Sequence, residues 1–159
     1  MAEMKANFQE LQENKIKGHG QYREITEEEF LPNVTGSKNV LVHFYHKDFE
    51  RCKIVDMHLR EIARTHLEAK FLYLNAEKAP FFIKKLQVQV LPTIIAFVDG
   101  IAVDRVVGFE DMGNRDDFPQ LALTRRLIRT GALKALNKSE TGQITIKKRK
   151  DDESDDDEY

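Results

Sequence analysis

The sequence predicts an α/β domain of three layers, in which helices cover both faces of a mixed central sheet. Three observations predict it. An apolar run at 40–45 lies directly before a long helical pattern at 49–66, which is typical of a β-α-β unit. A second apolar run at 71–74 follows, and a right-handed crossover makes it parallel to the first. Asp99-Gly100, a strong hairpin signal, separates two further apolar runs and predicts an antiparallel pair.

The amino-terminal part predicts short peripheral elements. Residues 2–16 show a partial helical period on a polar background, which predicts a peripheral helix. His19, between two glycines, lies where that helix ends, and we interpret it as a turn residue. A short strand is expected at 22–25. Thr26, with Glu29 three residues later, is a capping-box pattern and predicts the start of a second helix.

The two central elements carry the clearest patterns. The run at 40–45 is apolar on both faces, as expected for a strand that helices cover on each side. His43 is the exception, and we expect it to be packed and hydrogen-bonded. The helical pattern at 49–66 has a polar side that includes Asp56. Its predicted inner face consists of Ile54, Val55, Leu59, Ile62 and Ala63.

Beyond these elements, the sequence predicts two more helices and one loop. A short helix is expected at 81–86, and strands at 94–98 and 101–107 form the hairpin. The polar segment 109–117 predicts a loop whose end, residues 114–117, caps the last helix. That helix is expected at 118–129. Its predicted inner face consists of Leu121, Leu127 and Ile128.

Charge and composition predict three parts along the chain. These are an amino-terminal helix at 1–17, an α/β domain at 18–136 and a charged tail at 137–159. The alternative for the first part is that it forms the end of a longer helix. The tail contains KKRK at 147–150 and DDESDDDE at 151–158. Segments of this composition bury no core, so we expect the tail to be disordered.

Composition also bounds the function. The net charge of the 159 residues is −2, which gives no case for a nucleic-acid partner. No apolar run approaches the ~18 residues of a membrane span, so no membrane partner is expected. A single cysteine excludes an internal disulfide and suits a reducing compartment. We therefore expect a cytoplasmic protein, with a nuclear location as the alternative.

Several sequence strings resemble the thioredoxin superfamily. VLVHFYHKDFERCK stands where thioredoxins have a strand and the start of their Cys-x-x-Cys helix, and VLPTIIAFVDG stands where they have the cis-proline strand and hairpin. The resemblance covers nearly all of residues 38–130. Within that superfamily the chain resembles the phosducin-like branch. The strings that carry this narrower resemblance are GHGQYREI, HFYHKDFERCKIVDMHL, KFLYLNAEKAPFFIKKL and VVGFEDMGNRDDF.

The resemblance implies a binding role. Relatives in this branch are co-factors of the cytosolic chaperonin, CCT/TRiC, which folds actin and tubulin, and they act on its ATPase. We therefore expect a monomeric co-chaperone whose partners are this chaperonin and its actin and tubulin clients. Phosducins also bind G-protein βγ, so a βγ-binding adaptor is one alternative.

The redox residues of the superfamily are only partly present. Phe49 stands at the first cysteine position and Cys52 at the second. Thiol–disulfide exchange needs an exposed thiolate and a second thiol to resolve the mixed disulfide. We therefore interpret Phe49, Cys52 and Pro92 as a vestigial site of a non-enzyme, with Cys52 as a small buried apolar residue. A monothiol oxidoreductase acting through Cys52 is the enzymatic alternative.

The resemblance also places candidate contacts for a partner. A cis peptide before Pro92 would expose the backbone of Leu91 to an extended client segment, in the manner of strand addition. The carboxylates of the 109–117 loop form either a solvated surface or an acidic contact for a chaperonin subunit; they are Glu110, Asp111, Asp116 and Asp117.

The last two expectations concern modification and cofactors. Ser154 lies among acidic residues and is a candidate for phosphorylation. His43 and His46 lie on opposite faces of the predicted strand, and the single cysteine has no ligand cluster at metal-binding spacing. We therefore expect no metal and no cofactor.

Overall fold

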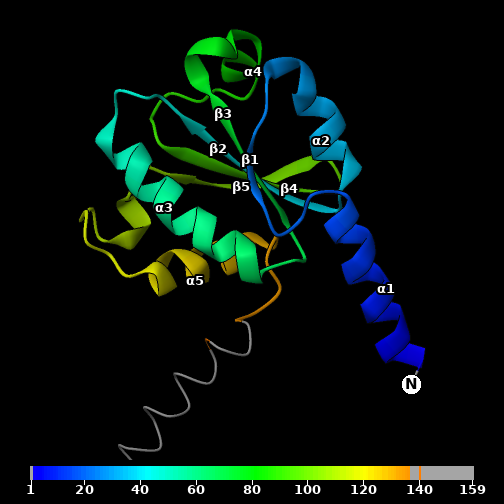
Figure 1. Cartoon of the computed structure of the whole chain (residues 1–159). Helices are drawn as coiled ribbons and strands as arrows, with labels where there is room; N and C mark the ends of the chain where they lie inside the picture. The colour runs from blue at the N-terminus through cyan, green and yellow to red at the C-terminus, as the bar shows by residue number, and fades with distance from the viewer. Residues whose placement is uncertain (1, 137–139, 141–159) are drawn as a thin grey trace, which may run out of the picture.

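The computed structural model describes residues 2–136 and 140, and it contains the predicted mixed sheet (Figure 1). The strand order is β1-β3-β2-β4-β5. β3 pairs in parallel with β1 and β2, whereas β4 is antiparallel to β2 and β5. The strands are β1 (Tyr22–Glu24), β2 (Asn39–Tyr45), β3 (Lys70–Asn75), β4 (Thr93–Val98) and β5 (Ile101–Val107).

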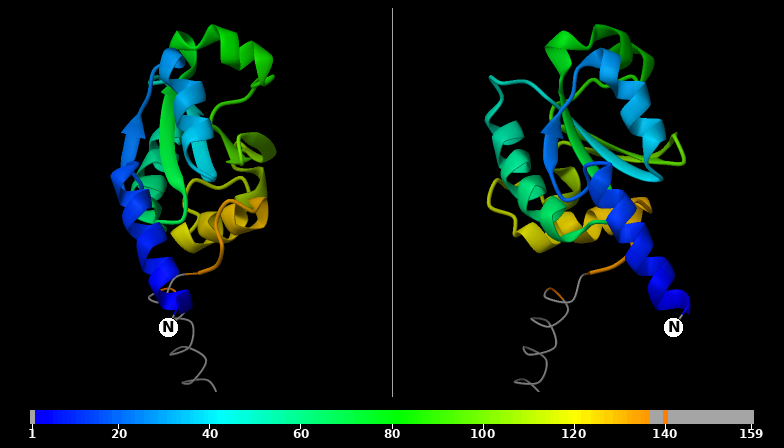
Figure 2. Two further views of the ribbon diagram at one scale, coloured as in Figure 1. Left: turned by 90° about the vertical axis from the view of Figure 1, so that its right-hand side faces the viewer. Right: turned by 45° about the vertical axis from the view of Figure 1, so that its right-hand side comes forward.

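The described residues form five helices, of which α1 extends away from the body of the domain (Figures 1 and 2). The helices are α1 (Ala2–Ile16), α2 (Phe30–Gly36), α3 (Glu50–Thr65), α4 (Pro80–Lys85) and α5 (Gln120–Thr130). Three single 3-10 turns lie between them, at Glu27–Glu29, Ala76–Lys78 and Glu110–Met112. The predicted tail at 137–159, with KKRK and Ser154, lies outside the described residues apart from Glu140.

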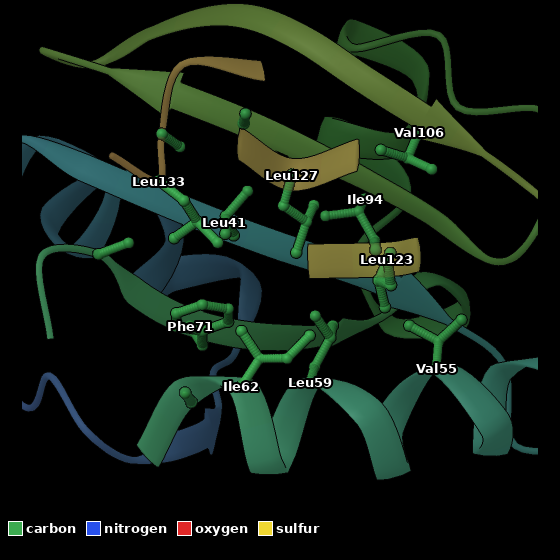
Figure 3. Packing of buried hydrophobic residues seen from close by; sticks show 14 of the residues in the cluster. Leu41, Val55, Leu59, Ile62, Phe71, Ile94, Val106, Leu123, Leu127 and Leu133 are labelled. Carbon is green, nitrogen blue, oxygen red and sulfur yellow. The ribbon is translucent and has the colours of Figure 1, made fainter. Parts of the chain in front are cut away.

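Alternation along the strands divides the core into two layers. Leu41 and Phe71 point to one side of the sheet, where they pack against α3 and α5 (Figure 3). Val42 and Leu72 point to the other side, where Phe30 of α2 packs against them. Each fully buried side chain of this size contributes about 1.5–3 kcal/mol. The three-layer α/β/α architecture predicted from the sequence is therefore confirmed.

Helix α3 begins immediately after Phe49, whose φ of −103° and ψ of 114° are extended. Its apolar face contacts the sheet as the spacing predicts, but the prediction for Asp56 was wrong. Asp56 is half-buried and turned toward the sheet rather than toward solvent. It follows Cys52 by four residues, so the two lie on the same face of the helix. Donors on β1 and β2 make that position favourable for a carboxylate.

The second predicted helix is correct in position but different in form. The backbone N–H of Thr26 donates to Oε1 of Glu29 at 2.9 Å, as the capping-box pattern predicts. This contact starts a single 3-10 turn, and the α-helix begins only at Phe30.

The start of the last helix was predicted wrongly, and its inner face was predicted only in part: Leu127 is in the core and Ile128 packs against it, but Leu121 does not. Phe118 is buried in the loop and Pro119 is extended, with φ −74° and ψ 151°, so α5 begins at Gln120 and residues 114–117 do not cap it. The buried face contains Leu123 and Leu127, one turn apart, whereas Leu121 and Ile128 are only half-buried. Insertion of the Phe118 ring into the core fixes where the helix starts and therefore which residues face inward.

Candidate functional site

Phe49 exposes an aromatic ring at the amino end of α3. Its side chain is 45% exposed, and its ring centroid lies 5.4 Å from that of His46. The carbonyl of Phe49 accepts a hydrogen bond from the backbone N–H of Cys52 at 3.1 Å, which begins the helical turn. A side chain without a nucleophilic atom therefore occupies the first cysteine position of the thioredoxin pattern.

Cys52, the only cysteine of the chain, lies behind this turn and is 1% exposed. Burial raises the pKa of its thiol, a backbone hydrogen bond from His46 opposes the change, and the charge of Asp56 adds to it. Because the thiolate is the reactive form, a raised pKa and a covered sulfur both disfavour exchange. The structure thus places Cys52 where the sequence pattern predicts a buried apolar residue.

Arg51 fastens the 109–117 loop to the start of α3. Its Nε donates to Oδ1 of Asp116 at 2.8 Å, and its Nη2 donates to the carbonyl of Asn114 at 3.1 Å. The guanidinium also lies over the ring of Phe109, 4.5 Å from the ring centroid. These contacts give the loop a defined position beside Phe49's helix turn.

Arginines balance most of the negative charge predicted for this loop. Arg126, which is buried, donates from Nε to Asp111 at 2.7 Å. Arg115 forms a two-bond contact with Asp117, at 3.0 and 3.1 Å. Together with the Asp116 pair, three of the four carboxylates therefore face an arginine of the same chain, while Glu110 is exposed. The loop presents alternating charges rather than a purely acidic surface.

The Leu91–Pro92 peptide is cis, as predicted, and it adjoins the same loop. The carbonyl of Pro92 accepts a hydrogen bond from the N–H of Gly108 at 2.8 Å. Leu91 is half-buried and Val90 is 48% exposed. Arg51 thus links the start of α3 to the 109–117 loop, and the Gly108–Pro92 hydrogen bond links the residue before that loop to the proline turn.

A buried polar cluster lies one helical turn below Cys52. Nδ1 of His43 is 3.0 Å from Oδ1 of Asp56 and 2.9 Å from the hydroxyl of Tyr22, and that hydroxyl donates to the same Asp56 oxygen at 2.5 Å. Burial favours a higher pKa for Asp56, but the hydrogen bonds from His43 and Tyr22 outweigh it and lower the pKa. Burial, followed by the charge of Asp56, raises the pKa of the Tyr22 hydroxyl.

This cluster joins β1, β2 and α3 around one carboxylate. His43 is fully buried, and in the described part of the chain its Nε2 has no hydrogen-bond partner. The sequence predicted the packed histidine but missed both of its partners. The only sequence signal for the cluster was the four-residue spacing between Cys52 and Asp56. Tyr22 had no such signal, because the pairing of β1 with β3 brings it near Asp56.

Comparisons with known proteins agree with this architecture. Residues 21–117 match the thioredoxin family. A mutant thioredoxin from Halobacterium salinarum superposes with a TM-score of 0.61 at 17% identity, covering 75% of this chain and 96% of that one. Spinach chloroplast thioredoxin f gives a TM-score of 0.60 at 21% identity, covering 74% and 93%. At this level of identity the similarity concerns the fold.

Sequence relatives define the branch. The chain is 51% identical to phosducin-like protein 3 of Dictyostelium discoideum over 77% of its own length and 67% of the relative's. It is 50% identical to human thioredoxin domain-containing protein 9, over 75% and 53%. The thioredoxin domain-containing protein PLP3B of Arabidopsis thaliana is 45% identical, over 88% and 61%. The chain thus spans about half to two thirds of the length of these relatives. It belongs to the thioredoxin family, as a phosducin-like member.

Proposed function

We propose that this chain is a redox-inactive co-chaperone of the thioredoxin fold. In this proposal it binds the cytosolic chaperonin, CCT/TRiC, and modulates both its ATPase and the folding of actin and tubulin. The supporting observation is the buried single thiol of Cys52 behind the exposed ring of Phe49. An exchange cycle needs a nucleophilic thiolate and a resolving thiol, and this site offers neither.

The surface around Phe49 suits protein contact instead. Aromatic side chains that become buried at the centre of an interface commonly supply much of its binding energy. Phe49 and Val90 are about half exposed, and the peptide between Leu91 and Pro92 is cis. In this proposal the backbone of Leu91 pairs with an extended segment of a partner. The apolar side chains therefore form the centre of the proposed docking surface.

The 109–117 loop forms the rim of that surface. The ion pairs Arg51–Asp116 and Arg115–Asp117 are exposed, and exposed pairs contribute little stability, typically ~0–1 kcal/mol. The Arg115–Asp117 pair lies within the loop and can exchange partners when a charged chaperonin subunit approaches, whereas Arg51 holds the loop in position. Charged rims of this kind mainly affect the rate and specificity of association.

A binding experiment with purified chaperonin tests the proposal. Phe49→Ser/Val90→Ser removes the two apolar side chains. We expect the dissociation constant for the chaperonin to rise about tenfold or more, with a matching loss of the effect on ATP hydrolysis. The control Ile101→Ser/Val103→Ser removes two comparably exposed apolar residues from β5 and should bind like the parent chain. Cys52→Ala should also bind normally.

Three outcomes would contradict the proposal. They are absence of chaperonin binding by the parent chain at low salt, equal losses in both double variants, and dependence of binding on Cys52. Capture of G-protein βγ in place of the chaperonin would favour the adaptor alternative. The proposal also places the protein in the cytoplasm, with access to the nucleus, and as a monomer, which sedimentation and cell fractionation test directly.

A further inference from the structure

A cluster of positive charge surrounds the start of the GHGQYREI segment, which the proposed docking surface does not use. Gly18 has a φ of +101°, and a methyl group at its Cα would lie 2.9 Å from the Arg23 guanidinium and 3.7 Å from the Lys70 ammonium. Both cations therefore lie against the same glycine. Lys17, the preceding residue, adds a third positive charge that acts on Lys70. We call Lys17, Arg23 and Lys70 the basic cradle.

A buried histidine holds this turn in place. Nδ1 of His19 lies 2.8 Å from the carbonyl of Leu67, so it must donate, and Nε2 lies 2.8 Å from Oγ of Ser37. Burial lowers the pKa of His19, and the charges of Lys70 and Lys17 lower it further. His19 is therefore a neutral residue with both nitrogens bonded, and not merely the turn residue that the sequence predicted. The cradle is built on a fixed piece of backbone.

The buried ammonium group of the cradle has a neutral hydrogen-bond partner. Lys70 is 8% exposed and donates to Oδ1 of Asn33 at 2.7 Å, a neutral acceptor. Burial lowers the pKa of Lys70, followed by repulsion from Arg23 and Lys17. Among the described residues, no carboxylate forms an ion pair with any of the three cations. The carbonyl end of α1 offsets only part of this repulsion.

The carboxylates that lie nearby are already engaged. Glu29 accepts from the backbone N–H of Thr26, and Glu24 accepts from the hydroxyl of Tyr45. Glu68 contacts Nδ1 of His66 at 2.9 Å. These carboxylates keep their charge and reduce the positive potential of the cradle, but among the described residues none lies within ion-pair distance of its cations, so the cradle can still take a further anion.

The chain itself contains a complementary segment. Seven of the eight residues at 151–158 are Asp or Glu. Glu140, the last described residue, contacts Nε2 of His66 at 3.2 Å, and the carbonyl of the next residue, Leu67, is the acceptor of His19. Glu140, after which the acidic run follows in the sequence, therefore lies near the turn that carries the cradle. A fully extended chain over positions 141–151 spans at most roughly 35–40 Å, which sets how far from Glu140 the acidic run can reach.

We propose that the basic cradle of Lys17, Arg23 and Lys70 binds the acidic run 151–158 of the same chain. The contact is electrostatic, so it weakens as salt shortens the screening length below the ~8 Å of physiological conditions. A phosphate on Ser154 would add about −1.5 to −2 charges and strengthen it. The tail would then lie over the junction of α1 and β1.

A spin label at the end of the full-length chain tests this contact. The label is attached through Tyr159→Cys in a Cys52→Ala background, and the backbone amide signals are recorded at about 0.05 M salt. The expected result is selective loss of signal at Gly18, Gly20 and Arg23. The loss should disappear at about 0.5 M salt and in the variant Lys17→Gln/Arg23→Gln.

Matched controls separate this contact from general attraction. Arg125→Gln/Arg129→Gln removes the same charge from two exposed arginines of α5 and should leave the signal loss intact. The proposal is overturned if no selective loss occurs, if it survives Lys17→Gln/Arg23→Gln, or if both double variants abolish it equally. It is also overturned if mixing isotope-labelled chain with spin-labelled chain reproduces the loss, because the contact is then between molecules.

Discussion

The two ends of helix α3 use their residues in opposite ways. At the amino end, Phe49 is exposed and Cys52 is buried with a raised thiol pKa, so the region presents shape and apolar surface. At the carboxyl end, His66 is 1% exposed and contacts Glu68 and Glu140 through its two ring nitrogens. The comparison shows that ionisable groups join segments of the chain at the carboxyl end, whereas at the amino end an aromatic ring occupies the position of the nucleophile.

The cluster of His43, Asp56 and Tyr22 lies between these ends and follows the pattern of the carboxyl end. It ties two strands to the helix through one carboxylate. If this division of roles is correct, polar substitutions below Cys52 reduce stability, whereas substitutions at Phe49 affect only binding.

The largest effect is expected for Asp56→Ala. The change leaves the His43 ring and the Tyr22 hydroxyl without their shared acceptor, which should cost about 2–4 kcal/mol of unfolding free energy. Because the pKa of Asp56 is lowered in the folded state, its contribution is present at neutral pH and is lost as the pH falls below ~3.9. Urea unfolding at pH 7 measures the effect, and the exposed Asp48→Ala should change stability by less than about 0.5 kcal/mol. Similar losses in both variants would contradict the role of the cluster.

The next effect concerns His66 and depends on pH. Burial favours a lower pKa for His66, but its bond to Glu68 and the charges of Glu68 and Glu140 outweigh it and raise the pKa. A raised pKa gives a stabilisation that is complete below ~6.5 and is lost as the pH rises. His66→Gln should therefore cost about 1–3 kcal/mol at pH 6 and clearly less at pH 8.5. A cost that is constant with pH would show that the carboxylate contacts are not responsible.

His19 should show the reverse dependence at a smaller magnitude. Its pKa is lowered, so the stability that the neutral ring contributes is present above ~6.5 and is lost as the pH falls. His19→Gln is expected to cost about 1–2 kcal/mol at pH 7.5, with a smaller difference from the parent chain at pH 5. Thermal unfolding across this pH range measures the stability cost of both histidine variants. If the costs of His19→Gln and His66→Gln changed with pH in the same direction, the two histidines would not have the opposite roles expected here.

The smallest effect on stability is expected at Phe49. Its ring is nearly half exposed and lies outside both core layers, so Phe49→Ser should change the unfolding free energy by less than about 0.5 kcal/mol. Leu59→Ala, on the buried face of the same helix, should cost about 2–5 kcal/mol. A large loss of unfolding free energy for Phe49→Ser in urea would mean that the ring packs against the domain and is not available to contact a partner.

The spacing of apolar residues and the turn signals between them were sufficient to predict the fold. The apolar strand at 40–45, the helix after it and the Asp99-Gly100 hairpin all have local signals, and the structure confirms them. Asp56 and the start of α5 were misplaced because their surroundings come from distant segments. Tyr22 reaches Asp56 through strand pairing, and the Phe118 ring shifts the start of α5.

The candidate site divides in the same way. The vestigial thiol position and the cis peptide at Pro92 follow from the sequence pattern, and the structure shows Cys52 buried and the peptide cis. The arginine partners of the loop carboxylates had no local signal, because Arg51 and Arg126 come from helices on either side of the loop. Paired charges of this kind become visible only when the chain is folded.

Catalytic reduction of insulin disulfides by the purified chain tests the central claim most directly. The parent chain and Cys52→Ala are compared in the presence of a dithiol reductant, with a two-cysteine thioredoxin as the positive control. The predicted result is that neither chain accelerates the reaction above the reductant alone. Turnover by the parent chain that disappears in Cys52→Ala would contradict a site without exchange chemistry.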